Sequence, residues 1–418
     1  MAAQAEKAHF SPHSAAVFDA VLLRGYPVYL WGFSAIDAYL GRSPGGAFFA
    51  LTGADPADLA RIFEELRYPG IDLADAALDS NGSAFYFRCA DFDAISGPAE
   101  KLLFSASGPF PAGEGCVPSF KILEFYRDLR TGHFIDPQGN YPLLRSIFKG
   151  QQPELLSHNV NPGIERRRAL MDWALILSKY FPLDGTKFPR AEVFRNLDEG
   201  PKPCIEEQRL LLTELLNAPN PALGLECLMR HGFIHEYWPE LAALNDVDHS
   251  KEFHPEGNVW KHTLETFRYR KTAAVKTARA YDLMLSLGLL LHDLGKPLAE
   301  NAGSKRFDGH AELGERQARR FLQRLGFEAE LITDVCYLVR NHMFPAALPR
   351  LPLIRTEEKM ASPLFPVLLE LYRCDESSSF KGLDGYYESS AAYQSFLRFR
   401  RNPYRTADGK KINKMECR

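Results

Sequence analysis

The pattern of hydrophobic and polar positions changes along the chain. Between residues 20 and 140, short β-rich runs at residues 26–30, 84–88 and 132–136 alternate with helix-like segments such as residues 34–40. This mixture predicts a small α+β unit in the first part of the chain.

From residue 165 onward the strand pattern fades, and apolar residues recur at three- and four-residue spacing. This spacing predicts amphipathic helices over residues 167–180, 205–216 and 222–229. Asn220 and Pro221 offer a cap and a first-turn proline for the last of them. Residues 258–400 are helical again between glycines and prolines, and the basic tail after residue 400 receives no structure. We therefore expect the second part of the chain to be all-α.

The composition is that of a globular, multidomain protein. The 418 residues include 45% hydrophobic and 25% charged side chains, which excludes a disordered, collagenous or coiled-coil protein. The net charge of −3 gives no support for a surface that binds nucleic acid over its whole extent. A basic run at residues 166–168 could contact a phosphate backbone, but a solvated helix face is the favoured interpretation.

The cysteines and the apolar runs indicate the compartment. The seven cysteines include no CxxC pair, which argues against a zinc ribbon or a complete disulfide framework and predicts a reducing, cytoplasmic environment. The N-terminus lacks a basic start followed by an apolar run, so we expect no signal peptide. The most apolar stretch, residues 283–291, is far shorter than the ~20 residues of a membrane span. We expect no membrane partner.

The residues that suggest chemistry are histidines and aspartates in the second half of the chain. His292 and Asp293 are adjacent and follow an apolar run, where an ionisable pair is costly to bury without a partner. Gly295 and Pro297 are expected to end that helix just beyond the pair. An imidazole beside a carboxylate can coordinate one divalent ion, or the carboxylate can bridge two.

Further members of the series lie on other predicted helices. His262 follows a turn and Asn258, a predicted N-cap, and Asp375 follows the apolar residues 367–372. A single histidine is more often a surface or core residue, and Asp375 alone could be a helix cap. The order His, His-Asp, Asp on helical segments nevertheless favours a metal site, to which His310 and His342 are weaker additions.

These residues resemble the HD superfamily of metal-dependent phosphohydrolases. The wider surroundings resemble the bacterial tRNA nucleotidyltransferases, the CCA-adding and poly(A) polymerase family with a C-terminal HD domain. The sequence blocks that carry the resemblance are HPEGNVWKHT, LLHDLGKP, GHAELGE and RNH, with NPALGLECLMRHGFIHEYWPELAAL upstream. The resemblance extends over roughly residues 20–380.

The resemblance implies a phosphoester hydrolase with one or two divalent ions. The implied metal ligands are His262, His292, Asp293, His310, His342 and Asp375. The implied catalytic residues are Asp293 and Lys296, and the implied substrate-binding residues are Lys296, His254 and Asn341. The bound ion would lower the pKa of a water, while Lys296 would offset charge on the phosphoryl group. Histidine ligands suit Mn, Fe, Co, Ni or Zn better than Mg, which prefers oxygen.

The N-terminal region resembles the nucleotidyltransferase head of the same family without its acidic pair. Nucleotidyl transfer needs two neighbouring carboxylates for two Mg ions, and these positions align with Ala47 and Phe49. The family's Gly-Gly motif aligns with Gly32-Phe33, where a phenylalanine blocks the approach of phosphate. Asp55 and Asp58 lie nearby but belong to a predicted helix start. The head is thus expected to be degenerate and its transferase activity lost.

The expected fold is multidomain: a small α+β nucleotidyltransferase-like head followed by all-α domains that include an HD domain. The expected boundaries are 1–146 for the head, 147–248 for a helical middle domain, 249–385 for the HD domain and 386–418 for a short tail. The favoured function is hydrolysis of a nucleotide, a 2′,3′-cyclic phosphate or an RNA 3′ end, with tRNA as a less supported partner. Two alternatives stay open: a working CCA- or poly(A)-adding transferase, and a non-catalytic protein that binds nucleotides or RNA ends.

Overall fold

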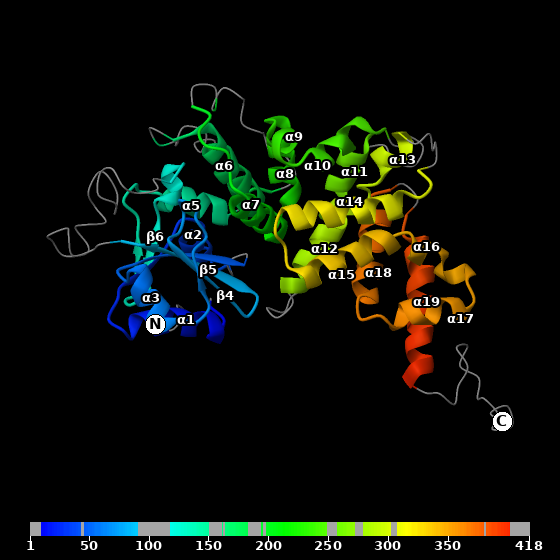
Figure 1. Cartoon of the computed structure of the whole chain (residues 1–418), viewed down its shortest axis with the longest axis horizontal. Helices are drawn as coiled ribbons and strands as arrows, with labels where there is room; N and C mark the ends of the chain where they lie inside the picture. The colour runs from blue at the N-terminus through cyan, green and yellow to red at the C-terminus, as the bar shows by residue number, and fades with distance from the viewer. Residues whose placement is uncertain are drawn as a thin grey trace. The chain divides into compact units, whose positions relative to one another are not determined.

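The computed structural model divides into two compact units. It describes residues 10–42, 46–90, 118–149, 161, 164–182, 194, 198–248, 257–271, 279–301, 307–379 and 382–401. The first unit comprises Met1–His231 with Val275–Arg279, and the second comprises Gly232–Ala274 with Ala280–Arg418 (Figure 1). His254 and the tail after residue 401 lie outside the described residues.

The first unit contains a sheet followed by helices. Its strands are β1 (Val28–Trp31), β2 (Ala47–Thr52), β3 (Leu66–Arg67), β4 (Ala76–Ser80), β5 (Ser83–Cys89), β6 (Tyr126–Asp128) and β7 (Phe134–Ile135). Its helices are α1 (Pro12–Leu22), α2 (Phe33–Tyr39), α3 (Pro56–Ile62), η1 (Lys121–Leu123), α5 (Tyr141–Phe148), α6 (Arg166–Tyr180), α7 (Ile205–Asn217) and α8 (Pro221–Arg230).

The strands form one mixed sheet in the order β3-β4-β5-β2-β1-β6-β7. Only β2 and β5 run parallel among these pairs, with Phe49 opposite Tyr86; the other pairs are antiparallel. Because successive side chains point to opposite faces of a strand, Phe49 and Tyr86 lie on the face that contacts Leu210 of α7. Phe48 and Phe85 lie on the other face against Phe18 of α1.

Helices α6 and α7 pack with the sheet, although we expected them in a separate middle domain. Lys179 at the end of α6 forms buried ion pairs with Asp37 of α2 (3.3 Å) and Glu214 of α7 (2.8 Å). Glu214 also accepts a hydrogen bond from the backbone N–H of Ala47 in β2 (3.1 Å). These contacts join the helices to the sheet and place the boundary between the two units after His231.

The second unit is helical throughout its described residues. Its elements are α9 (Phe233–Tyr237), α10 (Pro239–Ala242), η4 (Ala243–Asp246), α11 (Val259–Thr266), η5 (Phe267–Tyr269), α12 (Arg279–Leu291), α13 (Lys296–Asn301), α14 (His310–Arg324), α15 (Ala329–Asn341), α16 (Phe344–Ala347), η7 (Leu348–Arg350), α17 (Leu353–Ala361), α18 (Phe365–Ser377) and α19 (Asp384–Arg401). Among the described helices, we find no segment with the length and apolar character required to span a bilayer.

The predicted helices and strands are present, with local differences. The run at residues 132–136 contributes only the two-residue strand β7, because Gly132 belongs to the preceding turn: it has a φ of 80° and its N–H donates to the carbonyl of Asp128 (2.8 Å). Asn220 does not cap α8; its side-chain amide instead donates to the carbonyl of Phe181 (2.7 Å). Asp55 does cap α3, as the helix start at Asp55 and Asp58 predicted.

The expectation of a solvated helix face at residues 166–168 was wrong for two of the three arginines. The side chains of Arg167 and Arg168 are only 18% and 16% exposed. Arg167 donates to the carbonyl of Gly200 (2.6 Å), and Arg168 lies 3.5 Å from the carboxylate of Asp172. Both side chains are thus paired within the first unit, Arg167 with a neighbouring segment and Arg168 with a residue one turn along its own helix.

Candidate metal centre

The first residue of the series, His262, is fixed by a capped helix. The side chain of Asn258 accepts the N–H of Lys261 and caps α11, as predicted. One turn later, His262 is buried at 1% exposure and its Nε2 lies 3.0 Å from Oδ1 of Asp375. Asp375 lies in the last turn of α18, so α11 and α18 meet at this pair.

His292 and Asp293 lie in the turn that follows α12. The last residues of α12, Leu289 to Leu291, are fully buried, which directs the chain end of this helix into the interior. The two side chains are 1% and 2% exposed. The helix ends at Leu291, before the pair, and Pro297 begins α13 rather than ending α12.

A glycine contact brings His310 to this turn. A Cβ atom on Gly295 would overlap the carbonyl oxygen of His310 and lie 2.5 Å from the backbone nitrogen of Gly314, so only glycine permits the approach of α14. His310, the first residue of α14, consequently lies with its Nε2 3.7 Å from Oδ1 of Asp293. His342, just after α15, lies 3.9 Å from the same oxygen.

These residues form two groups that share one carboxylate. Among the described residues, two sets of three have ligand atoms within 4.8 Å of one another: His262, His292 and Asp293, and Asp293, His310 and His342. Asp375 adjoins the first set through His262 and through Nε2 of His292 (3.9 Å). The site thus brings together all six residues predicted as metal ligands.

Hydrogen bonds at the outer ring nitrogens orient the imidazoles. Nδ1 of His292, His310 and His342 lies 2.7–2.8 Å from the carbonyl of Leu289, Phe307 and Val339, respectively. Since a carbonyl only accepts, each Nδ1 carries the proton and each Nε2 presents a lone pair toward Asp293. The same assignment holds for His262, whose Nδ1 faces Oγ of Ser378 (3.3 Å). The hydroxyl proton of Ser378 is donated to the carbonyl of Asp375, so its oxygen can only accept the proton of Nδ1.

This arrangement is electrostatically incomplete without a cation. Nε2 of His310 faces Nε2 of His342 at 3.0 Å, and Nε2 of His262 faces a carboxylate oxygen at the same distance. Two lone pairs at that distance repel unless a proton or a metal ion lies between them. Nε2 of His292 is buried and has no hydrogen-bond partner among the described residues. The donor set of imidazole nitrogens and carboxylates therefore fits a divalent metal.

The pKa shifts favour the protonation states that bind metal. Burial alone would raise the pKa of Asp293, but neighbouring positive charge, including the ammonium of Lys296, lowers it well below its ordinary value. Burial lowers the pKa of His342 to about 4 and also lowers that of His310. At neutral pH these carboxylate and imidazole groups are in the forms that coordinate cations.

The other predicted site residues have different surroundings. Lys296 pairs with the carboxylate of Asp293, a predicted metal ligand, with its Nζ 2.6 Å from Oδ2. Asn341 uses its amide inside the protein, since it donates to the carbonyl of Tyr337 and accepts from Lys359, both at 2.8 Å. A substrate-binding role of Asn341 stays a prediction, as does that of His254, which lies outside the described residues.

Sequence reasoning missed Ser378, the hydroxyl partner of His262. Its only signal in the sequence is its position three residues after Asp375, in a Ser-rich segment without a recognisable motif. The contact between Ser378 and His262 depends on the packing of α18 against α11, which the sequence does not show.

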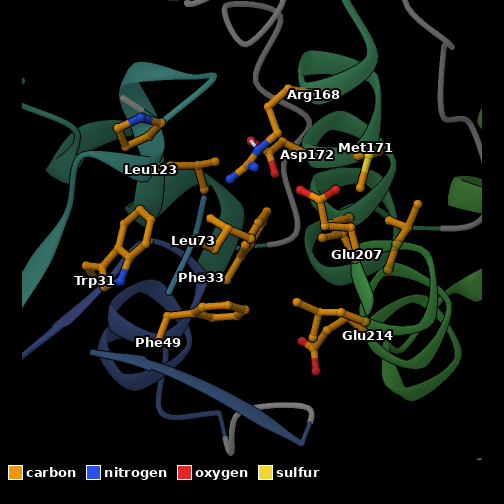
Figure 2. A pocket seen from close by; sticks show the side chains of 15 residues that line it. Trp31, Phe33, Phe49, Leu73, Leu123, Arg168, Met171, Asp172, Glu207 and Glu214 are labelled. Atoms are coloured by element: carbon orange, nitrogen blue, oxygen red, sulfur yellow. Dashed lines mark ion pairs between the residues drawn. The ribbon is translucent and has the colours of Figure 1, made fainter. Parts of the chain in front are cut away.

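In the first unit, the two positions expected for lost carboxylates lie side by side on one sheet face. Ala47 and Phe49 both belong to the cluster that faces α7, and Figure 2 shows Phe49 opposite Glu214. The carboxylate of Glu214 is held there by Lys179 and by the N–H of Ala47. Among the described residues, no group with metal-ligand geometry occurs at this place.

The second unit matches a known domain. The family model described as HD domain matches residues 259–371. That range includes five of the six residues of the candidate site and ends before Asp375.

Curated relatives of this chain include a tRNA nucleotidyltransferase and a Multifunctional CCA protein. Over 145 residues, 34% of this chain, it is 36% identical to the CC-adding tRNA nucleotidyltransferase of Thermus thermophilus, but the match spans only 32% of that relative. Over 332 residues it is 24% identical to the Multifunctional CCA protein of Xanthomonas campestris pv. campestris, covering 78% of this chain and 77% of the relative. A solved CCA-adding enzyme in complex with ATP aligns with 97% of this chain and 89% of its own, with 13% identity and a TM-score of 0.40.

Proposed function

We propose, from the HD domain in residues 259–371 and the relationship to tRNA nucleotidyltransferases, that this protein is a metal-dependent phosphoester hydrolase. The substrate class would be a nucleotide, a 2′,3′-cyclic phosphate or an RNA 3′ end. The observation that carries the proposal is the convergence of four inward-facing Nε2 atoms on two carboxylates.

The proposed ligands are His262, His292, Asp293 and Asp375 for one ion, with His310 and His342 for a second that shares Asp293. The mixture of nitrogen and oxygen donors suits Mn, Fe, Co, Ni or Zn, and suits Mg less well. When bound, such an ion lowers the pKa of water toward neutrality and withdraws charge from a phosphoryl oxygen.

The chain's own residues would prepare the site for a phosphate. The buried walls of α12 exclude water, which strengthens each electrostatic interaction in the centre. Lys296, which is 13% exposed at its side chain, lies close enough to Asp293 to offset negative charge on an incoming phosphoryl group. The carbonyl partners of the histidines hold the rings in place during turnover.

We infer that the head has lost nucleotidyl transfer. Ala47 and Phe49 offer no metal ligand, and the buried carboxylates of Asp37 and Glu214 are both paired with Lys179. Two Mg ions would have to displace that buried ammonium, which is costly because it leaves the network without its counter-charge.

Hydrolysis of bis(p-nitrophenyl) phosphate by the metal-loaded protein tests the proposed activity. Asp293→Asn should lower turnover by at least about 100-fold, because it removes the shared ligand. Asp384→Asn, at an exposed position of α19, is the matched control and should leave turnover unchanged. Lys296→Gln should lower turnover without loss of the ion. Wild-type protein that binds metal but does not hydrolyse the ester, or its cyclic and RNA counterparts, would contradict the proposal and favour a binding role.

The alternative of a working transferase is favoured by one observation, the similarity to a Multifunctional CCA protein over 332 residues. Incubation with tRNA that lacks its 3′ end, CTP, ATP and Mg separates the two functions. Efficient nucleotide addition would establish the alternative and overturn the proposed loss in the head.

A further inference from the structure

A cavity in the first unit has no role in the proposed hydrolysis. It lies between β1 and β2 on the sheet side and α6 and α7 on the helix side, and it encloses about 680 Å³ including the part open to solvent. Figure 2 shows Trp31 and Phe49 on one side, with Glu207 and Glu214 across from them. The size lies within the range of small-molecule sites.

The sheet side of the cavity is aromatic. Trp31, Phe33 and Phe49 line it, and Leu73, Leu123, Met171, Leu175, Leu210 and Leu211 complete the apolar surface. The rings of Trp31 and Phe49 contact each other edge to face with centroids 6.3 Å apart, which gives a rigid wall. The indole N–H of Trp31 is buried and has no acceptor among the described residues. Such a wall suits a flat aromatic ligand.

The helix side of the cavity is acidic. The charged lining residues are one cation, Arg168, and three carboxylates, Asp172, Glu207 and Glu214. Arg168 pairs with Asp172, and Lys179 compensates Glu214 together with the buried Asp37. The lining itself therefore holds three carboxylates and one guanidinium. A triphosphate would be repelled by this excess of negative charge, whereas a cation would be attracted.

Glu207 is the lining carboxylate that takes part in none of these ion pairs. Its Oε2 accepts the backbone N–H of Cys204 at the start of α7 (2.9 Å), a neutral donor. The carboxylate is partly exposed and lines the cavity opposite the aromatic wall. Glu207 closes the capping box of α7 and forms no ion pair among the described residues. Aromatic faces and a carboxylate without an ion pair around one space are the elements with which proteins bind organic cations.

We propose that this cavity binds a small aromatic amine that is protonated at neutral pH. The ring lies against Trp31 and Phe49, and the ammonium group lies toward Glu207 and Asp172. This site is separate from the proposed hydrolase centre, and neither depends on the other.

Three indoles of similar shape and different charge test the proposal. Tryptamine is a cation, tryptophol is neutral and indole-3-acetate is an anion at pH 7. Calorimetric titration of the full chain should give saturable binding of tryptamine, with affinity roughly tenfold above tryptophol and further above indole-3-acetate, because each charge step changes the interaction with the carboxylates. The N–H resonance of Trp31, assigned with Trp31→Phe, should shift on addition of tryptamine.

Neutral substitutions separate the charge from the shape of the cavity. Glu207→Gln keeps the acceptor for Cys204, and Asp172→Asn keeps the side-chain volume. Each should weaken tryptamine about five- to tenfold and leave tryptophol unchanged, because a carboxylate charge is removed and, in Asp172→Asn, the guanidinium of Arg168 also loses its ion-pair partner. Glu64→Gln, at an exposed position after α3, is the control and should change neither affinity.

Equal affinity for the three indoles, or no saturable binding of tryptamine, would overturn the proposal. Tighter binding of CTP or ATP than of tryptamine, with a shift of the Trp31 resonance, would also overturn it and assign the cavity to nucleotides. These outcomes are independent of phosphodiesterase activity, so none of them argues for or against the proposed hydrolase function.

Discussion

At the scale of single residues, hydrogen bonds at Nδ1 determine which ring nitrogen of each histidine in the candidate centre carries the proton. Three histidines donate Nδ1–H to backbone carbonyls, and the fourth donates to Ser378. This leaves each Nε2 as an acceptor directed at a carboxylate or at another Nε2. A site organised in this way has its ligands oriented before the cation arrives, because the backbone fixes the tautomers.

Ser378→Ala should weaken metal binding, because His262 loses the acceptor that fixes its tautomer. Loss of such an outer partner lowers metal affinity by about 10–100-fold. Titration with Mn or Zn against a competing chelator measures the effect. Ser377→Ala is the matched control, since that hydroxyl donates only to the carbonyl of Arg373 in its own helix (2.7 Å). Equal metal affinities of the two variants would show that Ser378 does not orient His262 for metal binding.

The metal-free protein should lose stability on acidification between pH 6.5 and about 4. His342 in the folded protein has a pKa lowered to about 4 by burial, against an ordinary value of 6.5. The unfolded chain therefore binds more protons in this window, and the free energy of unfolding falls as the pH decreases, by up to about 3 kcal/mol. Urea titrations across the window measure the slope. His342→Asn should flatten it, and an unchanged slope would contradict the buried, neutral state of His342.

At the scale of elements, the centre depends on how closely α14 approaches the turn after α12. Gly295 and Gly314 lie against each other, and no side chain fits between them. This contact places His310 near Asp293 and so supplies one ligand of the second group. The first group, with His262 and His292, does not depend on α14.

Gly295→Ala should displace α14 and reduce binding of a second ion more than that of the first. Gly288→Ala, one turn before the end of α12, is the control. A methyl group there would come closest to Cδ1 of Leu371 (2.9 Å) and Cδ1 of Leu338 (3.1 Å), the ends of side chains that can move, and alanine favours the helix by about 1 kcal/mol. Metal stoichiometry of both variants tests the contact. Full occupancy in Gly295→Ala would show that the close approach is not required.

Elements with strong periodicity were predictable, while contacts between them were not. The apolar spacing predicted α6, α7 and α8 to within two residues, and Asn258 predicted the start of α11. The parallel pairing of β2 with β5 follows from tertiary packing and has no local signal. The six metal-ligand candidates were identified from the sequence, yet their shared geometry and the role of Ser378 depend on the meeting of α11, α14 and α18.

At the scale of the whole molecule, the two units carry different kinds of buried charge. The second unit gathers imidazole and carboxylate acceptors that could hold a cation. The first unit contains its own, since Lys179 lies between Asp37 and Glu214 and all three side chains are at most 6% exposed. Burial would lower the pKa of Lys179, but the two carboxylates raise it above its ordinary value, so the ammonium stays charged. The charged groups of this network therefore stabilise the fold of the first unit through ion pairs and are not available to bind a metal.

Lys179→Met should destabilise the first unit by about 3–5 kcal/mol, because two carboxylates then stay buried without a counter-ion. Metal binding by the second unit should be unchanged. Thermal unfolding and metal titration on the same variant separate these effects. Asp37→Asn, which leaves the ion pair of Lys179 with Glu214 intact, should be milder. A Lys179→Met variant as stable as the wild type would contradict the structural role of the network.

The metal content of the protein shows whether the histidines and aspartates of the second unit hold a cation together. After removal of bound ions with a chelator and reloading with Mn, mass spectrometry of the washed protein should find about one to two ions per chain, and Asp293→Asn should retain little of either. Wild-type protein that retains no ion at neutral pH, or an Asp293→Asn variant that retains as many as the wild type, would contradict the account.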